Sequence, residues 1–148
     1  LGLCYRYFDS KQILFNTAID LYIEECCNSY LAILHDSTIT IKDKIDALFT
    51  SIGDEHSNMQ YYDFFHRVEN EELHEQLSIK LCKYMYPHLL EAVKKAIAAK
   101  EIYIENPEAL ISFIIYGQVG LLSKSNIDHH EVAKLLNQYV NQLMKFNP

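Results

Sequence analysis

The sequence predicts an all-α fold. Hydrophobic residues make up 49% of the 148 residues, and only four glycines and three prolines interrupt them. Apolar residues recur at three- and four-residue spacing along most of the chain, as expected for helices that bury one face. A chain of this length corresponds to about one domain and can form a single hydrophobic core.

The first long helix is expected from Ser10 to about Leu34. Asp9 is a candidate N-cap, and Gln12 follows three residues later, as in a capping box. Phe8 and Ile13 occupy the two positions of a hydrophobic staple. We therefore expect a short aromatic helix to end near Phe8 and the long helix to follow at once.

Lys11 stands in the first turn of this long helix, where the helix dipole disfavours a cation. Free backbone N–H groups at a helix start bind anions, so a lysine there indicates a phosphate site. Tyr5, Arg6 and Tyr7 come just before it, and such side chains commonly contact nucleic-acid phosphates. The residues alone equally allow core aromatics beside a solvated lysine.

Two further helices are expected in the centre of the chain. One covers Ile41 to Ile52, after a polar turn at 35–40, and ends with Gly53 as its C-cap. The other covers Glu71 to Lys100, with a kink or break caused by Pro87.

Between these two helices the chain is rich in aromatic residues. Tyr61, Tyr62, Phe64 and Phe65 occupy four of five positions, more than one narrow helical stripe can hide. They either form a bulky part of the core or line an apolar pocket with a few polar tips, as small-molecule sites do. The ligand-binding residues that we expect are Tyr62, Phe65, His66, Cys82, Tyr86, Phe113 and Tyr116.

The last two helices indicate a protein interface. Asn106 and Pro107 mark the start of a helix that is apolar almost all round to Leu122 and therefore must be covered on both sides. The final helix, from about Asp128 to Phe146, has one broad apolar face. The two helices could form a buried hairpin in a monomer. We favour a homodimer, because a chain of 148 residues has few other helices to bury an almost wholly apolar helix. The expected interface residues are Ile111, Ile115, Val119, Leu122, Leu136, Tyr139, Val140 and Leu143.

A short N-terminal pattern resembles a known family. Gly2, Tyr5, Tyr7, Phe8, Ser10, Lys11, Leu14 and Phe15 form the spacing Gly-x-x-Tyr-x-Tyr-Phe-x-Ser-Lys-x-x-Leu-Phe. This resembles the end of the helix-turn-helix signature of TetR-family transcriptional regulators. The resemblance implies that residues 1–9 are a remnant of the DNA-binding domain and its recognition helix. It also implies that residues 10–148 form a ligand-binding domain that dimerises through a four-helix bundle of the last two helices.

Carried over by position, the resemblance implies that Tyr5, Tyr7 and Lys11 contact DNA phosphates, while Leu3 and Arg6 lie nearer the bases. Leu3 departs from the small polar residue often found at that position. The chain opens inside the recognition helix, so we expect operator DNA binding only when the missing N-terminal helices are restored. A net charge of −7 fits this, because a complete DNA-binding module usually presents a basic face.

Other features restrict the class of protein. Cys4, Cys26, Cys27 and Cys82 form no CxxC pair, and neither a signal peptide nor a membrane-spanning apolar run is found. We therefore expect a cytoplasmic protein without membrane association. We also expect no cofactor and no enzymatic activity.

The resulting hypothesis is a repressor that an apolar or aromatic small molecule releases from its operator. The ligand would favour the conformation whose recognition helices are wrongly spaced for two operator half-sites. One alternative is a helical protein-interaction module, which predicts no cavity between the aromatic segment and the Pro87 helix. A less favoured alternative is a helical-bundle metalloenzyme, because Asp63-x-x-His66 and Glu71-x-x-His74 have the spacing of di-iron ligands but lack a matching glutamate pair.

Overall fold

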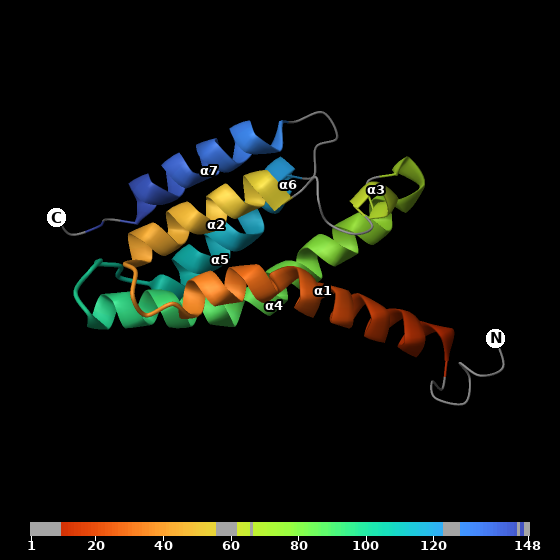
Figure 1. The fold of residues 1–148 in the computed structure, drawn as a ribbon, viewed down its shortest axis with the longest axis horizontal. Coiled ribbons are helices and arrows are strands. Elements are labelled where there is room, and N and C mark those ends of the chain that lie inside the picture. Colours follow the sequence, from red (N-terminus) through yellow and green to blue (C-terminus); the bar gives the residue numbers. More distant parts are fainter. Residues whose placement is uncertain (1–9, 56–61, 66, 123–127, 145, 147–148) are drawn as a thin grey trace.

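The computed structural model describes residues 10–55, 62–65, 67–122, 128–144 and 146, with 54, 55, 62, 63 and 129 described by their backbone only. The helical elements are α1 (Lys11–His35), α2 (Ile41–Glu55), α3 (Tyr62–Phe65), the 3₁₀ turn η2 (Val68–Asn70), α4 (Glu71–Ala98), α5 (Pro107–Gly117), α6 (Val119–Leu122) and α7 (His129–Leu143). The all-α prediction is confirmed (Figure 1). Within the described ranges, no helix combines the length and apolarity that a membrane span requires.

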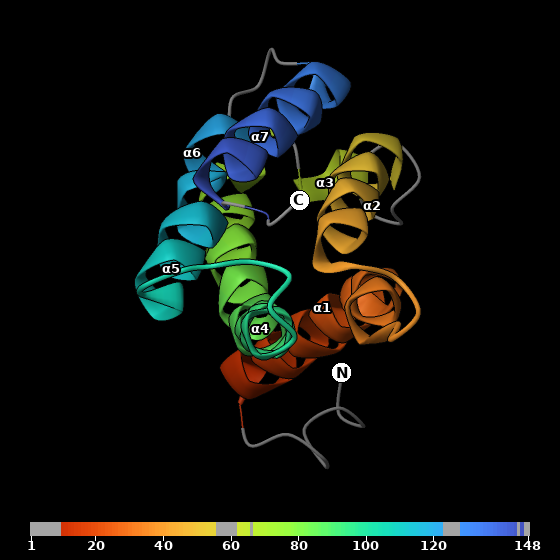
Figure 2. The ribbon, with the colours of Figure 1, turned by 90° about the vertical axis from the view of Figure 1, so that its left-hand side faces the viewer.

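The helices enclose one core. α1 packs along α4, α5 packs on the other side of α4, and α7 packs against α2. In Figure 2, α5 and α6 lie at the left, α7 at the top and α2 at the right, with α1 and α4 below. Buried apolar side chains from α1, α2, α4, α5 and α7 belong to a single cluster.

The start of α1 differs from the expectation by one residue. Ser10 is the N-cap, since its Oγ accepts a hydrogen bond from the backbone N–H of Ile13 at 3.1 Å. Serine caps a helix as well as aspartate does, so sequence pattern alone did not separate the two neighbours. Asp9 lies outside the described residues.

Gly53 is not the C-cap of α2. It lies within the helix, which continues to Glu55. A Cβ atom on Gly53 would lie 3.0 Å from Nδ1 of His130 in α7. Glycine is therefore used here for the close approach of two helices rather than for a turn.

The other helix boundaries match the predictions only in part. A kink or break was expected at Pro87; α4 continues through Pro87 as one helix, so a break is absent. Asn106 caps α5 by accepting from the N–H of Ala109 at 2.9 Å, with Pro107 at the first helical position, as predicted. The helix expected to reach Leu122 is instead divided into α5 and α6 at Gln118.

The final helix is shorter than expected. Asp128 caps α7 by accepting a hydrogen bond from the N–H of His130 at 2.9 Å. The helix ends at Leu143, and Phe146 forms an isolated antiparallel bridge with Ile102. Phe146 therefore pairs with the segment before α5.

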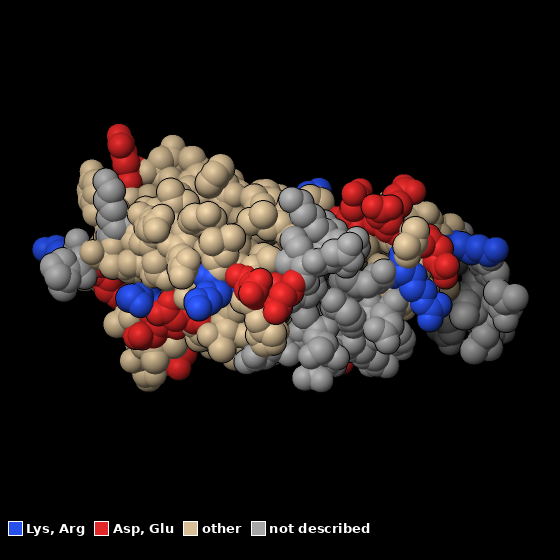
Figure 3. Space-filling model, turned by 90° about the horizontal axis from the view of Figure 1, so that it is seen from above, with Lys and Arg blue, Asp and Glu red and all other residues tan. Residues whose placement is uncertain are grey.

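Charged side chains are unevenly distributed over the face shown in Figure 3. A broad area of this face shows no lysine, arginine, aspartate or glutamate, although α7 itself carries the exposed Glu131 and Lys134. Charged residues lie along one edge of this area and again towards the end of the molecule that holds the first turns of α1 and α4.

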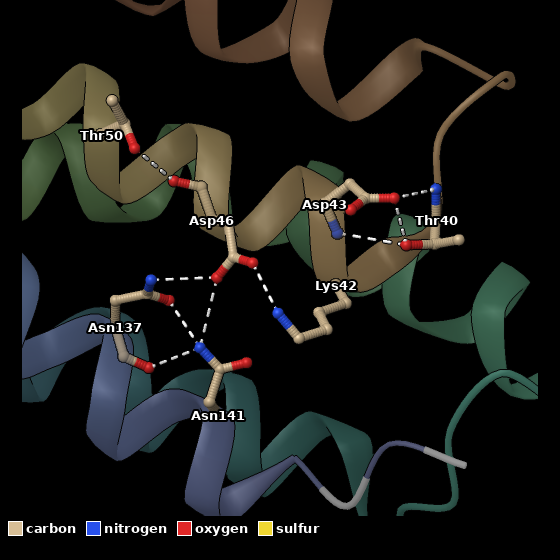
Figure 4. A network of polar contacts seen from close by, with 7 residues as sticks. All are labelled: Thr40, Lys42, Asp43, Asp46, Thr50, Asn137 and Asn141. Atoms are coloured by element: carbon tan, nitrogen blue, oxygen red, sulfur yellow. Dashed lines mark hydrogen bonds and ion pairs between the residues drawn. The ribbon is translucent and has the colours of Figure 1, made fainter. Parts of the chain in front are cut away.

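A polar network fixes α7 against α2 (Figure 4). Oδ1 of Asp46 accepts from Nδ2 of Asn137 at 2.9 Å and from Nδ2 of Asn141 at 3.3 Å, and its Oδ2 lies 2.7 Å from Nζ of Lys42. Burial by itself raises the pKa of Asp46, but the hydrogen bonds from Lys42, Asn137 and Asn141 outweigh it, so the pKa lies below its usual value. Asp46 is therefore a charged acceptor that holds the two helices in register.

Replacement of Asp46 by alanine is expected to lower the free energy of unfolding by about 1 kcal/mol at neutral pH, since the side chain is partly exposed. The control Lys42→Ala breaks only an exposed ion pair and should change stability by less than about 0.5 kcal/mol. The contribution of Asp46 is present above its unfolded pKa, near 3.8, and is lost as the pH falls through the lower folded pKa. Urea unfolding at neutral pH and at a pH below the folded pKa of Asp46 measures this. Equal losses of stability for the two variants at neutral pH would contradict it.

Candidate ligand-binding site

A cavity of about 230 Å³ lies inside the helical core. Its wall is formed by residues of α1, α2, α3, α4, α5, α6 and α7 together with Gln118 and Met144. The described side chains around it include no aspartate, glutamate, lysine or arginine. It is therefore an apolar site with a few neutral polar groups, the usual character of a small-molecule pocket.

One face of α1 contributes a mixed set of side chains to the cavity. Tyr22, Cys26, Tyr30 and Leu34 follow one another at four-residue spacing, so they form one stripe of the helix. The ring of Tyr22 stacks on that of Phe65, with 5.2 Å between the ring centroids. Burial, followed by a hydrogen bond with Cys26, raises the pKa of Tyr22, which keeps its hydroxyl neutral.

Three reduced cysteines lie in the cavity wall where α1 and α4 pack together: Cys26, Cys27 and Cys82. Burial raises the pKa of Cys27 to about 12 and that of Cys82 to about 11. The thiol of Cys82 donates a hydrogen bond to the carbonyl oxygen of Ile115 at 3.2 Å. At neutral pH Cys27 and Cys82 are thus protonated, and they act as small polarizable packing groups rather than as nucleophiles.

The expected ligand-binding residues are only partly brought together. Phe65 and Cys82 line the cavity, whereas the half-buried Tyr86 lies outside its wall. Phe113 is 68% exposed and Tyr116 is 38% exposed, so both point away from it. The side chains of Tyr62 and His66 lie outside the described part of the chain.

The displacement of Phe113 and Tyr116 follows from helix geometry. Ile111 and Ile115 on α5 are 3% and 2% exposed and face the cavity. Position 113 lies two residues from both, so Phe113 points to the opposite side of the helix. Sequence reasoning chose the aromatic residues of α5, while its aliphatic residues form the cavity wall.

Several residues of the cavity wall were not among the expected ones: Tyr22, Tyr30, His74, Ser78 and Gln118. The four-residue repeat Tyr22-Cys26-Tyr30-Leu34 is a signal that was available, because polar groups within an otherwise apolar stripe indicate a pocket. No comparable signal marks Gln118, which reaches the cavity because α5 ends there.

The expected interface residues must also be revised. Ile111, Ile115, Leu136 and Val140 are buried by the chain's own helices, which leaves them unavailable to a partner. Val119 and Leu122 are half-buried and line the cavity, so they too belong to the core. Only Tyr139 and Leu143, 50% and 44% exposed, lie on the surface.

Exposed apolar residues and glycines do occur on α5, α6 and α7. We define the α5–α7 face as the exposed residues Phe113, Tyr116, Gly117, Gly120, Leu135, Tyr139 and Leu143. A Cβ atom on Gly117 or Gly120 would meet nothing within 4 Å, so the backbone there is open to close approach. On α7, this stripe lies on the opposite side from Asn141, which faces α2.

Of the expected DNA-contacting residues, the structure describes Lys11. Lys11 is the first residue of α1 and is exposed. Leu3, Tyr5, Arg6 and Tyr7 are outside the described residues.

Comparison of the chain with models of known protein families, with curated protein sequences and with solved structures finds no match. Within the described residues, no group of three or more histidine, cysteine, aspartate or glutamate side chains is placed to hold a metal ion. The features that bear on function are therefore the cavity, the α5–α7 face and the N-terminal sequence pattern.

Proposed function

We propose that this chain is the ligand-binding and dimerisation part of a TetR-like transcriptional regulator, a repressor that leaves its operator when an apolar small molecule fills the cavity. The observation that carries the proposal is that α1 forms part of the cavity wall. The same helix begins within the N-terminal pattern that resembles the helix-turn-helix signature. One helix thus joins the cavity to the segment proposed to contact DNA.

The geometry of α1 supports transmission of a ligand signal. Its middle packs on α4, where Asp20 pairs with Lys80 at 2.7 Å, whereas its first turns extend beyond the rest of the body (Figure 1). Ile13 and Phe15 in these turns are exposed. A ligand that favours one position of α1 over another therefore shifts residues 1–9, and differential affinity for the two positions is sufficient for induction.

Dimerisation is the second part of the proposal. TetR-like regulators act as dimers because two recognition helices must meet half-sites one DNA turn apart, about 34–36 Å. We assign the α5–α7 face to this contact, with a second copy of the chain as its occupant. Exposed aromatics beside small residues favour close helix packing, and residues 109–122 contain no charged side chain.

A helical protein-interaction module is the second candidate, and the α5–α7 face favours it, since an apolar surface of this kind can also bind another protein. The cavity favours the regulator. An interaction module was expected to have no cavity between the aromatic segment and the Pro87 helix, yet Phe65 and Met85 of these two segments both line one.

The experiment requires the complete DNA-binding unit. The first two helices of a TetR-like DNA-binding unit are joined to the N-terminus of the chain, an operator is selected from random DNA, and DNA affinity is measured with and without a ligand found by thermal-shift screening of the 148-residue chain. We expect the ligand to lower DNA affinity by about 5- to 150-fold, the usual range of allosteric coupling. Equal affinities would reject induction.

Two control variants separate DNA contact from ligand response. Lys11→Ala removes a proposed phosphate contact, so it should weaken DNA binding to a similar degree with and without ligand. Val119→Phe fills part of the cavity and should leave DNA affinity unchanged while abolishing the ligand response. A Val119→Phe variant that still responds would place the ligand elsewhere.

A further inference from the structure

The contacts of α4 with its two neighbouring helices, α5 and α1, show which residues lie at each end of the cavity. The thiol of Cys82 meets the carbonyl of Ile115, and Nζ of Lys94 lies 2.6 Å from the carboxylate of Glu108. Residue numbers therefore rise along α4 as they fall along α5, so the two helices are antiparallel. The beginning of α4 lies beside the end of α5.

This arrangement gathers polar groups at one end of the cavity. His74 and Ser78 come from the beginning of α4, and Gln118 comes from the end of α5. The hydroxyl of Ser78 donates to the carbonyl of His74 at 2.9 Å, which leaves its oxygen able to accept. The side-chain amide of Gln118 makes no hydrogen bond to the part of the chain that the structure describes.

The contact between α1 and α4 adds a tyrosine to the same end. Asp20 pairs with Lys80, and the ring of His35 lies 5.7 Å from that of His88, so these two helices run in the same direction. Tyr22 therefore lies near the beginning of α4. Its phenol joins the polar end of the cavity.

The other end of the cavity is entirely apolar. It is lined by Leu34, Ile41, Ile45, Leu89, Val93 and Met144. From His74 to Val93 the wall follows α4 for about 28 Å at the helical rise of 1.5 Å per residue. The cavity wall thus follows α4 over several turns, which suits an elongated ligand.

We propose that the cavity binds a single-chain amphiphile whose alkyl or acyl chain lies along α4 towards Val93 and whose uncharged head, an alcohol, ester or amide, hydrogen-bonds to Gln118. This inference rests on the proposed function, because it names the ligand class of the same site. An apolar wall that follows α4 from a polar end to an apolar end favours a linear chain over a fused-ring ligand. A charged head is disfavoured because the described residues of the wall include no aspartate, glutamate, lysine or arginine, and an unpaired buried charge is costly.

Binding to the purified 148-residue chain tests the ligand class without DNA. Isothermal titration calorimetry at about pH 8 compares 1-dodecanol below its solubility limit with dodecanoate and dodecyltrimethylammonium below their micelle concentrations. We expect 1-dodecanol to bind at least tenfold more tightly than either ion, and affinity to rise about fourfold per methylene from octanol to dodecanol. The proposal is overturned if an ion binds as tightly as the alcohol or if 1-dodecanol does not bind.

Variants at the two ends of the cavity test the orientation of the chain. Leu89→Phe fills the apolar end and should shorten the preferred alcohol by two or more carbons. Leu90→Phe is the matched control, because Leu90 packs against the core on the same helix but does not line the cavity. If Leu89→Phe fails to fold, the milder Val93→Ile serves the same purpose. An unchanged length preference in the folded variant contradicts the proposed orientation.

The head group is tested by Gln118→Leu. This change should weaken 1-dodecanol binding about threefold to tenfold, the loss expected for one neutral hydrogen bond, and leave the binding of dodecane unchanged. Equal losses for both ligands would show that Gln118 acts only by packing and would overturn its assigned role.

These results distinguish failure of the inference from failure of the proposed function. If a ring-shaped or charged ligand binds instead and lowers operator affinity, the amphiphile assignment is wrong and the regulator stands. If 1-dodecanol binds as expected but the restored protein holds its operator equally well, the regulator is wrong and the ligand class stands.

Discussion

Replacement of Leu136 by alanine is expected to lower the free energy of unfolding by about 2–5 kcal/mol, the range found for buried leucines. Leu136 lies on α7, is 7% exposed and belongs to the core cluster. Its truncation leaves a void between packed helices that can collapse only in part. Since a domain of this kind has a total stability of about 5–15 kcal/mol, the effect is a large fraction of the whole.

Tyr139→Ala is the matched control, three residues further along the same helix. Its side chain is 50% exposed, so the expected loss within one protomer is below about 1 kcal/mol. Urea unfolding followed by circular dichroism compares the variants at several protein concentrations, because dimerisation contributes a concentration-dependent term. Equal, concentration-independent losses would mean that the buried and exposed faces of α7 are assigned wrongly.

Local sequence chemistry predicted much of the fold. The start of α5 at Asn106 and Pro107 depends on a cap and a ring that act within one helical turn, so the residues alone determine it. The role of Gly53 could not be predicted in this way. It depends on His130, which lies far away in the sequence and approaches Gly53 only when α7 packs on α2.

The cavity was harder to predict than the helices. α5 is apolar almost all round, so its sequence has no periodicity that distinguishes the inner face from the outer one. The aromatic residues Phe113 and Tyr116 were therefore chosen over Ile111 and Ile115, which form the wall. Gln118 became a cavity residue only through the antiparallel packing of α4 and α5.

The same ambiguity affected the interface. We expected the most apolar positions of the last two helices to meet a partner, but the chain's own helices cover them. Ile111 and Ile115 are covered because α5 packs on α4. The surface left over, the α5–α7 face, is less apolar in sequence but is the part that a second copy can reach.

Substitution of Phe113 by lysine is expected to raise the dissociation constant of the proposed dimer at least 30-fold, corresponding to about 2 kcal/mol for an aromatic hot spot. Phe113 is 68% exposed in the single chain, so the change leaves the core intact. Within a dimer the lysine would place an unpaired charge against an apolar surface, which adds a desolvation cost to the lost packing. Sedimentation equilibrium measures the dissociation constant directly.

Tyr103→Lys provides the control for this substitution. Tyr103 is 69% exposed, nearly the same fraction as Phe113, but it precedes α5 and lies outside the α5–α7 face. The Tyr103→Lys substitution should leave the dissociation constant of the dimer unchanged. A difference between the two lysine variants then reflects the position of the lysine rather than its charge. A wild-type chain that is monomeric at micromolar concentration, or a Phe113→Lys variant that still pairs, would contradict the assigned interface. If the dimer is lost as expected, the restored protein should also lose operator affinity, because a single recognition helix engages only one half-site.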